Sequence, residues 1–265
     1  IALTYDGKNS NSDYSLSASY SQLNRDPYAA DTPGTNEKKY KSWNIEARDT
    51  IRTSDNNKLI FGGEYRGDKA SIYSGDNTVK NTDQYSLYLY DEYRVDNKLL
   101  LTPAIRYDYH KSFGSHTSPN LGATYFISDK SRFKANYGTS YRAPSFTHGG
   151  IWGGMAIVGN PDLKPEKSKG WEISYEQEFG DTTSAKLTYF DNKKEDAISY
   201  KIEMAPPSQM GKFYNIDSTS SKGVEFEIKH DFGKGFTLVG NYNWLDSVDD
   251  TTGERLNYNA RNTYM

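Results

Sequence analysis

Apolar and polar residues alternate with a period of two along most of this chain. From Gln84 to Val95, one face carries aromatic and aliphatic side chains, while the other is polar or amphipathic. The first set is Tyr85, Leu87, Leu89, Tyr93 and Val95, and the second is Ser86, Tyr88, Tyr90, Glu92 and Arg94. Side chains of a β-strand point alternately to opposite faces, so this spacing predicts strands and not helices. The alternation recurs in segments that begin at Trp43, Phe133, Trp171 and Val224.

These segments amount to about 12 strands at a mean spacing of about 22 residues, well above the roughly 8–12 of a compact sandwich. Short turns are expected at Lys8–Ser12, Ser54–Asn57, Asp96–Lys98, Ser128–Lys130, Gly180–Thr182 and Gly233–Gly235. Longer connections are expected at Asn24–Lys38, Ser74–Asp83, Lys111–Thr117, Ala143–Lys167 and Glu203–Asn215. Because every second connection is short, the chain is predicted to be an up-and-down antiparallel meander. Transmembrane β-barrels have this layout, with short periplasmic turns and long extracellular loops.

Aromatic residues make up 14% of the chain and gather near the predicted strand ends. Toward the long connections these are Tyr20, Tyr40, Trp43, Tyr109, Tyr141, Tyr200 and Trp244, and toward the short turns Phe126, Phe133, Phe179, Phe232 and Phe236. Two aromatic girdles flank the apolar band of a transmembrane barrel. A soluble β-sandwich or an elongated antiparallel sheet is the alternative, with tyrosines in cross-strand pairs. Neither alternative explains the alternating connection lengths, so we favour the barrel.

Composition and charge exclude several classes of protein. The 32 Lys+Arg and 35 Asp+Glu give a net charge of −3, so no basic excess indicates nucleic-acid binding. The absence of cysteine excludes disulfides, thiolate metal sites and cysteine nucleophiles. No run of about 20 apolar residues is present, which excludes a transmembrane helix. Since the chain starts at Ile1 and ends in what looks like the start of another segment, we expect it to be part of a longer protein.

If the apolar face of the strands meets lipid, the polar face lines a lumen. That face carries both signs of charge. Its members include Arg48, Arg66, Arg94, Arg106, Arg142, Glu46, Glu64, Glu92, Glu172, Glu176, Glu225 and Glu227. Barrels of about 8 strands fill their interior with side chains, whereas barrels of about 22 strands need a plug, so a charged interior indicates a wide lumen. We expect most of these charges to pair across neighbouring strands.

Two short motifs separated by a long connection carry a resemblance to a known family. The first is Tyr141-Arg142-Ala143-Pro144, and the second, from Gly159 to Ser168, reads GNPDLKPEKS. The chain resembles the β-barrel domain of TonB-dependent outer-membrane receptors, which carry an aromatic-Arg-Ala-Pro element, a long extracellular loop and then Asn-Pro-x-Leu-x-Pro-Glu. Similar stretches elsewhere are Tyr88–Tyr93, Ala104–Asp108, Leu187–Asp191, Asp196–Ile198, Tyr214–Asn215 and Lys222–Glu225.

The chemistry of the motif residues indicates a mainly structural role. Pro144 cannot continue a ladder, and Pro161 and Pro165 stiffen the segment that returns to the wall. The motif positions interpreted in this way are Tyr141, Arg142, Ala143, Pro144, Asn160, Pro161, Leu163, Pro165 and Glu166.

The resemblance implies a 22-strand barrel in the outer membrane of a Gram-negative-type envelope, occluded by an N-terminal plug. Residues 1–265 would then be a partial barrel domain, without the plug and the terminal strands. Such receptors bind a scarce metal complex outside and release it inward when the TonB energy-coupling complex acts on the plug. The implied partners are TonB, the cargo and outer-membrane lipid, with no nucleic acid and no intrinsic cofactor.

A ferric siderophore is the first expectation for the cargo, because siderophore receptors are the most numerous in the family. Haem is the second, since His148 lies in the loop where haem receptors of the family carry an iron-ligating histidine; His148 is therefore a metal ligand only if the cargo is haem. Cobalamin follows. The candidate ligand-binding residues are His148, Trp152, Met155, His110 and His116. Histidine is also an ordinary residue of polar loops, so these positions have a structural alternative.

Other function classes find less support in the sequence. No Gly-x-Ser-x-Gly, no HExxH and no carboxylate pair with distinctive spacing is present, so we expect no enzyme activity. A passive porin is the alternative of a different class, although it would not account for the two-part motif. The exposed loops of such receptors also resemble docking sites for phages and bacteriocins, and no residue here identifies one.

Overall fold

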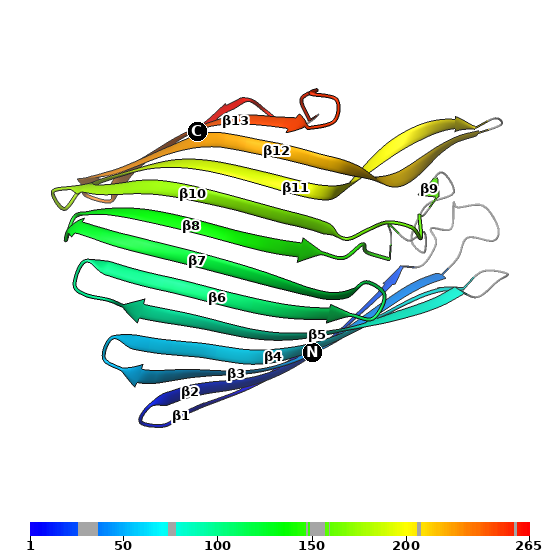
Figure 1. Cartoon of the computed structure of the whole chain (residues 1–265), viewed down its shortest axis with the longest axis horizontal. Helices are drawn as coiled ribbons and strands as arrows, with labels where there is room; N and C mark the ends of the chain where they lie inside the picture. Colours follow the sequence, from blue (N-terminus) through cyan, green and yellow to red (C-terminus); the bar gives the residue numbers. More distant parts are fainter. Residues whose placement is uncertain are drawn as a thin grey trace.

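The computed structural model describes residues 1–25, 37–73, 78–146, 148, 157–158, 160–205, 208–256 and 259–265. Over these residues the chain forms strands, turns and bends (Figure 1), and no helix there could cross a membrane. The strands are β1 (Ala2–Lys8), β2 (Ser12–Arg25), β3 (Glu37–Ser54), β4 (Asn57–Tyr73), β5 (Thr78–Arg94), β6 (Leu99–His110), β7 (Gly114–Ser128), β8 (Ser131–Arg142), β9 (Ile157–Val158), β10 (Glu166–Phe179), β11 (Thr183–Ala205), β12 (Ser208–Gly233), β13 (Phe236–Asp249) and β14 (Asn262–Tyr264).

The strands form one curved antiparallel sheet in chain order, from β1 to β8 and then from β10 to β14 (Figure 1). β9 lies off this path, and it pairs in parallel with Gly211 and Lys212 of β12. All the strands of the path except β14 are seven residues or longer, which agrees with the predicted number. The predicted all-β meander is therefore confirmed, and the sheet is open, since β1 and β14 do not pair.

The six predicted short turns all occur, and they lie at one end of the sheet (Figure 1). Glycine is needed at two of them: Gly180 has a φ of 65°, and Gly233 and Gly235 have φ of 76° and 81°. These are left-handed conformations that residues with a Cβ rarely adopt.

Three of the predicted long connections are wrong. Residues 111–113 suffice to join β6 to β7, residues 74–77 join β4 to β5, and residues 206–207 join β11 to β12. The strands continue through the remainder, so that β11 has 23 residues and β12 has 26, where about 9–11 cross a membrane. Beyond a membrane both faces of a strand meet water, so the apolar alternation fades while backbone pairing persists.

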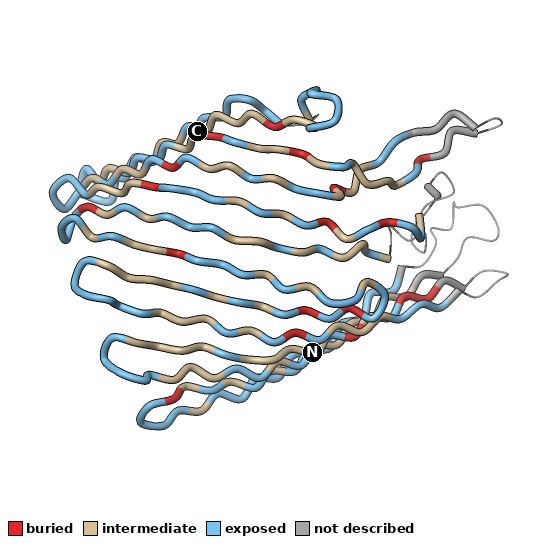
Figure 2. Tube along the Cα trace, viewed as in Figure 1, coloured by how far each residue is buried: buried red, intermediate tan, exposed pale blue. Residues whose placement is uncertain are grey.

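The two faces of the sheet differ in chemistry as predicted. Cross-strand partners such as Glu46 and Glu64, or Ser86 and Asp108, keep the polar side chains on one face. The other face is apolar and bare, with Leu87 66% exposed. Among the described residues the only buried hydrophobic ones are Ala70, Leu163 and Ala197, and most of the trace is exposed or intermediate (Figure 2). A single sheet with one bare apolar face is not a sandwich; it suits contact with lipid.

Two of the predicted girdle aromatics lie on the polar face instead. Tyr40 lies on the same face of β3 as Ser42 and Glu46. Phe126 is the register partner of Arg132, so it lies on the same face as that arginine. The Arg94 guanidinium lies over the Phe126 ring, 5.6 Å from its centroid. The sequence places an aromatic residue near a strand end, but only the register shows which face it occupies.

Candidate functional site

The two halves of the family motif meet at the outer ends of β8 and β10. Arg142 and Glu166 are register partners, and the Arg142 guanidinium forms an ion pair with the Glu166 carboxylate. Glu166 is only 5% exposed, and its Oε1 also accepts a hydrogen bond from the Ile198 N–H at 2.8 Å. One carboxylate therefore ties β8, β10 and β11 together at the rim.

The return segment before β10 is held by side-chain amides. Asn160 Nδ2 donates to the Phe213 carbonyl at 3.1 Å. Asn215 accepts from the Lys164 N–H at 2.9 Å and donates back to the Lys164 carbonyl at 3.0 Å. Leu163 between them is buried. These bonds explain how a segment with two prolines, neither of which has a backbone N–H to donate, re-enters the sheet at a fixed register.

His148 lies against the outer part of β12. Its ring centroid is 4.7 Å from that of Phe213, its Nδ1 accepts the Ser145 N–H at 3.3 Å, and its carbonyl accepts the Asn160 N–H at 2.9 Å. Burial and the positive charge of Arg142 hold the pKa of His148 below its usual value. The ring is therefore neutral at pH 7, with Nε2 as the nitrogen that has no hydrogen bond among the described residues.

A cavity of about 600 Å³ opens at the same rim, between the outer ends of β2–β6 and the chain that follows β8. Its wall combines basic, acidic and aromatic side chains. The charged and aromatic members are Tyr40, Arg66, Asp68, Lys80, His110, Phe113, Tyr141, Arg142 and Phe146. This volume falls within the roughly 300–1,000 Å³ of small-molecule sites.

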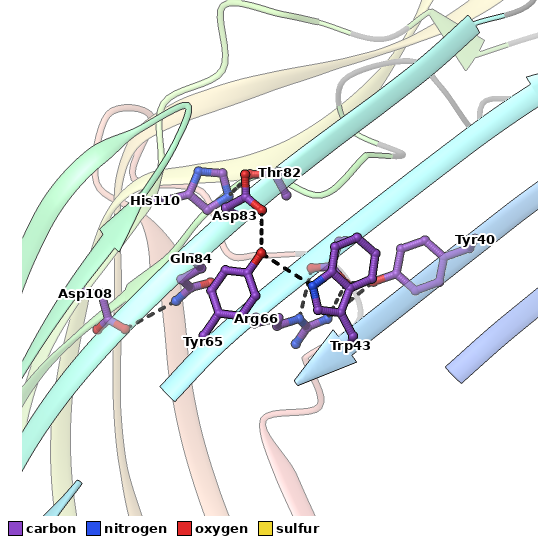
Figure 3. A network of polar contacts seen from close by, with 10 residues as sticks. Tyr40, Trp43, Tyr65, Arg66, Thr82, Asp83, Gln84, Asp108 and His110 are labelled. Carbon is purple, nitrogen blue, oxygen red and sulfur yellow. Dashed lines mark hydrogen bonds and ion pairs between the residues drawn. The ribbon is translucent and has the colours of Figure 1, made fainter. Parts of the chain in front are cut away.

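The cavity wall is held by a polar network (Figure 3). Asp68 accepts hydrogen bonds from the Tyr40 hydroxyl and, at 2.9 Å, from Arg66 Nε. His110 is 6% exposed; its Nδ1 accepts the Ser112 N–H at 3.1 Å, so its Nε2 carries the proton and faces Thr82 Oγ1 at 3.2 Å. Both nitrogens of His110 are thus engaged within the wall.

A second network lies deeper on the same face. Asp108 accepts hydrogen bonds from Ser86 Oγ at 2.6 Å, from Gln84 Nε2 at 3.2 Å and from Arg106 Nε at 3.0 Å. Arg106 also pairs with Glu64 at 2.9 Å. These inward charges satisfy one another across neighbouring strands, as the sequence predicted for most of them.

The structure does not bring the three rim histidines together. His110 lines the cavity, His148 packs on Phe213, and His116 stacks on Tyr141 at 4.9 Å between ring centroids. Within the described ranges no group of three or more potential ligands is placed to hold a metal ion. Trp152 and Met155 lie outside the described residues.

Sequence reasoning missed several residues of the cavity wall, namely Tyr40, Arg66, Asp68, Lys80 and Thr82. The sequence pattern could have indicated them, because all five occupy the alternate positions of β3, β4 and β5 that point to the polar face of the sheet. What the sequence did not show was that these strands continue to the rim, which brings their outer ends into one cavity.

Comparison with known proteins agrees with this architecture. The whole chain, residues 1–265, matches the family described as "TonB dependent receptor-like, beta-barrel". It is 30% identical over 207 residues to the "Iron-regulated outer membrane virulence protein" of Vibrio cholerae, covering 71% of this chain and 32% of that protein. It is 28% identical over 241 residues to the "Heme/hemopexin utilization protein C" of Haemophilus influenzae, covering 75% and 34%. The chain thus spans about a third of the length of these relatives.

Solved structures share the fold at lower sequence identity. A siderophore receptor of Pseudomonas aeruginosa superposes with a TM-score of 0.78 at 19% identity, over 93% of this chain and 47% of that one. A ferric enterobactin receptor variant of the same organism gives 0.80 at 18% identity, over 99% and 45%. The match over the full chain, together with the open antiparallel sheet and its bare apolar face, identifies the family. This chain belongs to the family of TonB-dependent receptors, and it is part of their outer-membrane β-barrel domain.

Proposed function

We propose that the protein containing this chain imports a ferric complex, with a ferric siderophore as the cargo. The observation that carries the proposal is the cavity at the outer rim, whose wall joins Arg66, Lys80 and Arg142 to the rings of Tyr40 and Phe113. Cations and aromatic faces together suit a compact, anionic complex with conjugated groups. The V. cholerae relative, named as iron-regulated, supports iron as the metal.

Haem is the second candidate, favoured by the name of the H. influenzae relative and by His148. His148 is neutral, and imidazole is a common axial ligand of haem iron. Because its Nδ1 accepts the Ser145 N–H, its Nε2 carries the proton, so binding iron through Nε2 would require the other tautomer and loss of that hydrogen bond. His110 is less suited, because both of its ring nitrogens already hold hydrogen bonds within the wall. We further propose that uptake is driven by TonB acting on a plug inside the charged lumen, and that the protein is a transporter and not an enzyme.

The cargo is tested by titrating the full-length protein in detergent with a panel of ferric siderophores and with haem. Lys80→Gln, which removes one exposed cation from the cavity wall, should weaken binding of an anionic ferric siderophore about fivefold. Lys229→Gln is the matched control, since Lys229 lies on the same face at the opposite rim and should bind cargo as wild type does.

The outcomes separate the candidates. Siderophore binding that weakens in Lys80→Gln alone supports the first proposal. Saturable haem binding that is lost in His148→Ala and unaffected by Lys80→Gln moves the assignment to haem. Binding of neither probe would contradict both.

A further inference from the structure

An aromatic belt crosses the outward, apolar face of β2–β6 near the long-connection rim. Its members are Tyr20, Trp43, Tyr65, Tyr85 and Tyr109. The Tyr65 and Tyr85 ring centroids are 5.0 Å apart, and Trp43 Nε1 donates to the Tyr65 hydroxyl at 3.4 Å (Figure 3). Aromatic rings with polar tips lie where hydrocarbon gives way to lipid headgroups, so this belt marks the outer boundary of the membrane.

Two lysines lie directly beyond the belt. Lys41 and Lys69 are register partners on β3 and β4. Lys41 lies two residues before Trp43 and Lys69 two residues after Gly67, so both lie one step nearer the rim than the belt. Their side chains are therefore on the same outward face as Trp43. Two residues of strand span about 7 Å, which places the two ammonium groups at the level of the lipid headgroups.

Lys41 and Lys69 lie directly opposite each other on the outward face without a compensating acid. Neither forms an ion pair or a hydrogen bond within the part of the chain that the structure describes. Asp68 lies on the inward face, and Asp83 is already engaged by the Tyr65 hydroxyl at 2.9 Å and by Lys111 at 3.4 Å. Like charges directly opposite on antiparallel strands destabilise a sheet, so an external anion would stabilise this arrangement.

The same cross-strand row supplies neutral donors on both sides of the lysines. Gln22 is the register partner of Lys41, and Asn81 is the register partner of Lys69. Gln22 Nε2 donates one of its two hydrogens to Asn24 Oδ1 at 2.9 Å, which leaves the second N–H for an external acceptor. Across β2–β5 the row therefore reads amide, ammonium, ammonium, amide. Charged and neutral N–H donors in one row suit the several acceptor oxygens of a phosphate group.

We propose that this row of Gln22, Lys41, Lys69 and Asn81, called the basic row, binds the phosphate of a phosphorylated glycolipid in the outer leaflet. The acyl chains of the same molecule would extend over the belt and the apolar face below it, where Ile45 is 48% exposed. A water-soluble phosphate would gain nothing from that apolar surface, which is why the proposal commits to a membrane lipid.

The test uses the full-length protein in neutral detergent, titrated with diphosphorylated lipid A and observed by native mass spectrometry. Lys41→Gln with Lys69→Gln should weaken lipid binding about 30-fold, as expected for two lysines near an anionic surface. Lys41→Arg with Lys69→Arg should retain it. Lys98→Gln with Lys234→Gln, the same change in charge at the short turns, should bind lipid as wild type does.

Three results would overturn the proposal. Unchanged affinity in the Lys41 and Lys69 glutamine variant would show that the basic row does not contact the phosphate. Equal weakening in the control pair would show only a general effect of net charge. Displacement of the lipid by millimolar inorganic phosphate would assign the row to a soluble anion.

Discussion

Glu166 joins three strands through one carboxylate, and this explains why a glutamate follows the prolines of the return segment. Its oxygens hold the Arg142 guanidinium and the Ile198 N–H while the side chain is 5% exposed. An acceptor in this position satisfies a charge and a backbone donor that would otherwise be left unpaired at the rim.

Glu166→Gln should destabilise the protein by about 1–2 kcal/mol, because the amide turns a donor toward the Arg142 guanidinium. The measurement is the urea midpoint of unfolding for the full-length protein in lipid vesicles. Glu195→Gln is the control, since Glu195 pairs with Lys169 at 3.6 Å with both side chains about half exposed, and exposed pairs contribute little. Equal midpoints for the two variants would contradict this role of Glu166.

His148 makes the contact of its loop with β12 sensitive to pH. Its pKa in the folded protein lies below the ordinary value of about 6.5, because burial and Arg142 disfavour the charged ring while Glu166 opposes them in part. The contact is fully present above that ordinary value and weakens as pH falls toward the folded pKa. Protonation also converts Nδ1, which accepts the Ser145 N–H, into a donor.

Acidification from pH 7.5 to 5.5 should therefore reduce protection of the Asn160 N–H from hydrogen exchange, after correction for the intrinsic rate. The loss should be about threefold to tenfold, and His148→Phe should remove the pH dependence while keeping the ring packed on Phe213. A pH dependence that persists in His148→Phe would assign the effect to another group.

At the scale of elements, the hairpin of β11 and β12 extends well beyond the ends of β8 and β10 (Figure 1). The two strands stay paired to the register partners Ala205 and Ser208, and β9 adds to the free edge of β12. This outer ladder contributes no apolar surface to the membrane band, so its stability is separable from that of the wall.

Replacing residues 201–212 by a two-residue Asn-Gly turn should leave the wall folded, with an unchanged thermal transition of the full-length protein in detergent. Removing the register-matched residues 187–192 and 221–226 from the same two strands should prevent folding, because these residues lie in the membrane band. Loss of the folded form after the outer deletion would show instead that the projecting ladder nucleates the hairpin.

At the scale of the whole molecule, stability cannot come from a core. Within the described ranges only three hydrophobic residues are buried, and most of the trace is exposed or intermediate (Figure 2). Large apolar side chains of the outward face, such as Leu87 and Ile105, are exposed. Lipid supplies the missing contact on that face, and salt bridges such as Arg132 with Glu176 at 2.6 Å hold the other. The two open edges of the sheet carry unpaired backbone groups, which lipid does not tolerate. A 22-strand closed barrel around a plug stays our prediction for the complete protein.

The sequence by itself determined the strand class, the antiparallel order, the six tight turns and the two faces of the central, clearly alternating parts of the strands, because period-two patterning and turn chemistry are local properties. The sequence also indicated the family, through the motif Tyr141–Pro144 and the segment around Pro161. Tertiary structure alone decided which strands continue past the membrane, because backbone pairing persists there without an apolar signal. It likewise decided that Tyr40 faces inward, that Lys41 opposes Lys69, and that His148 rests on Phe213. Each depends on the register or contact between strands that are distant in sequence, which no single segment encodes.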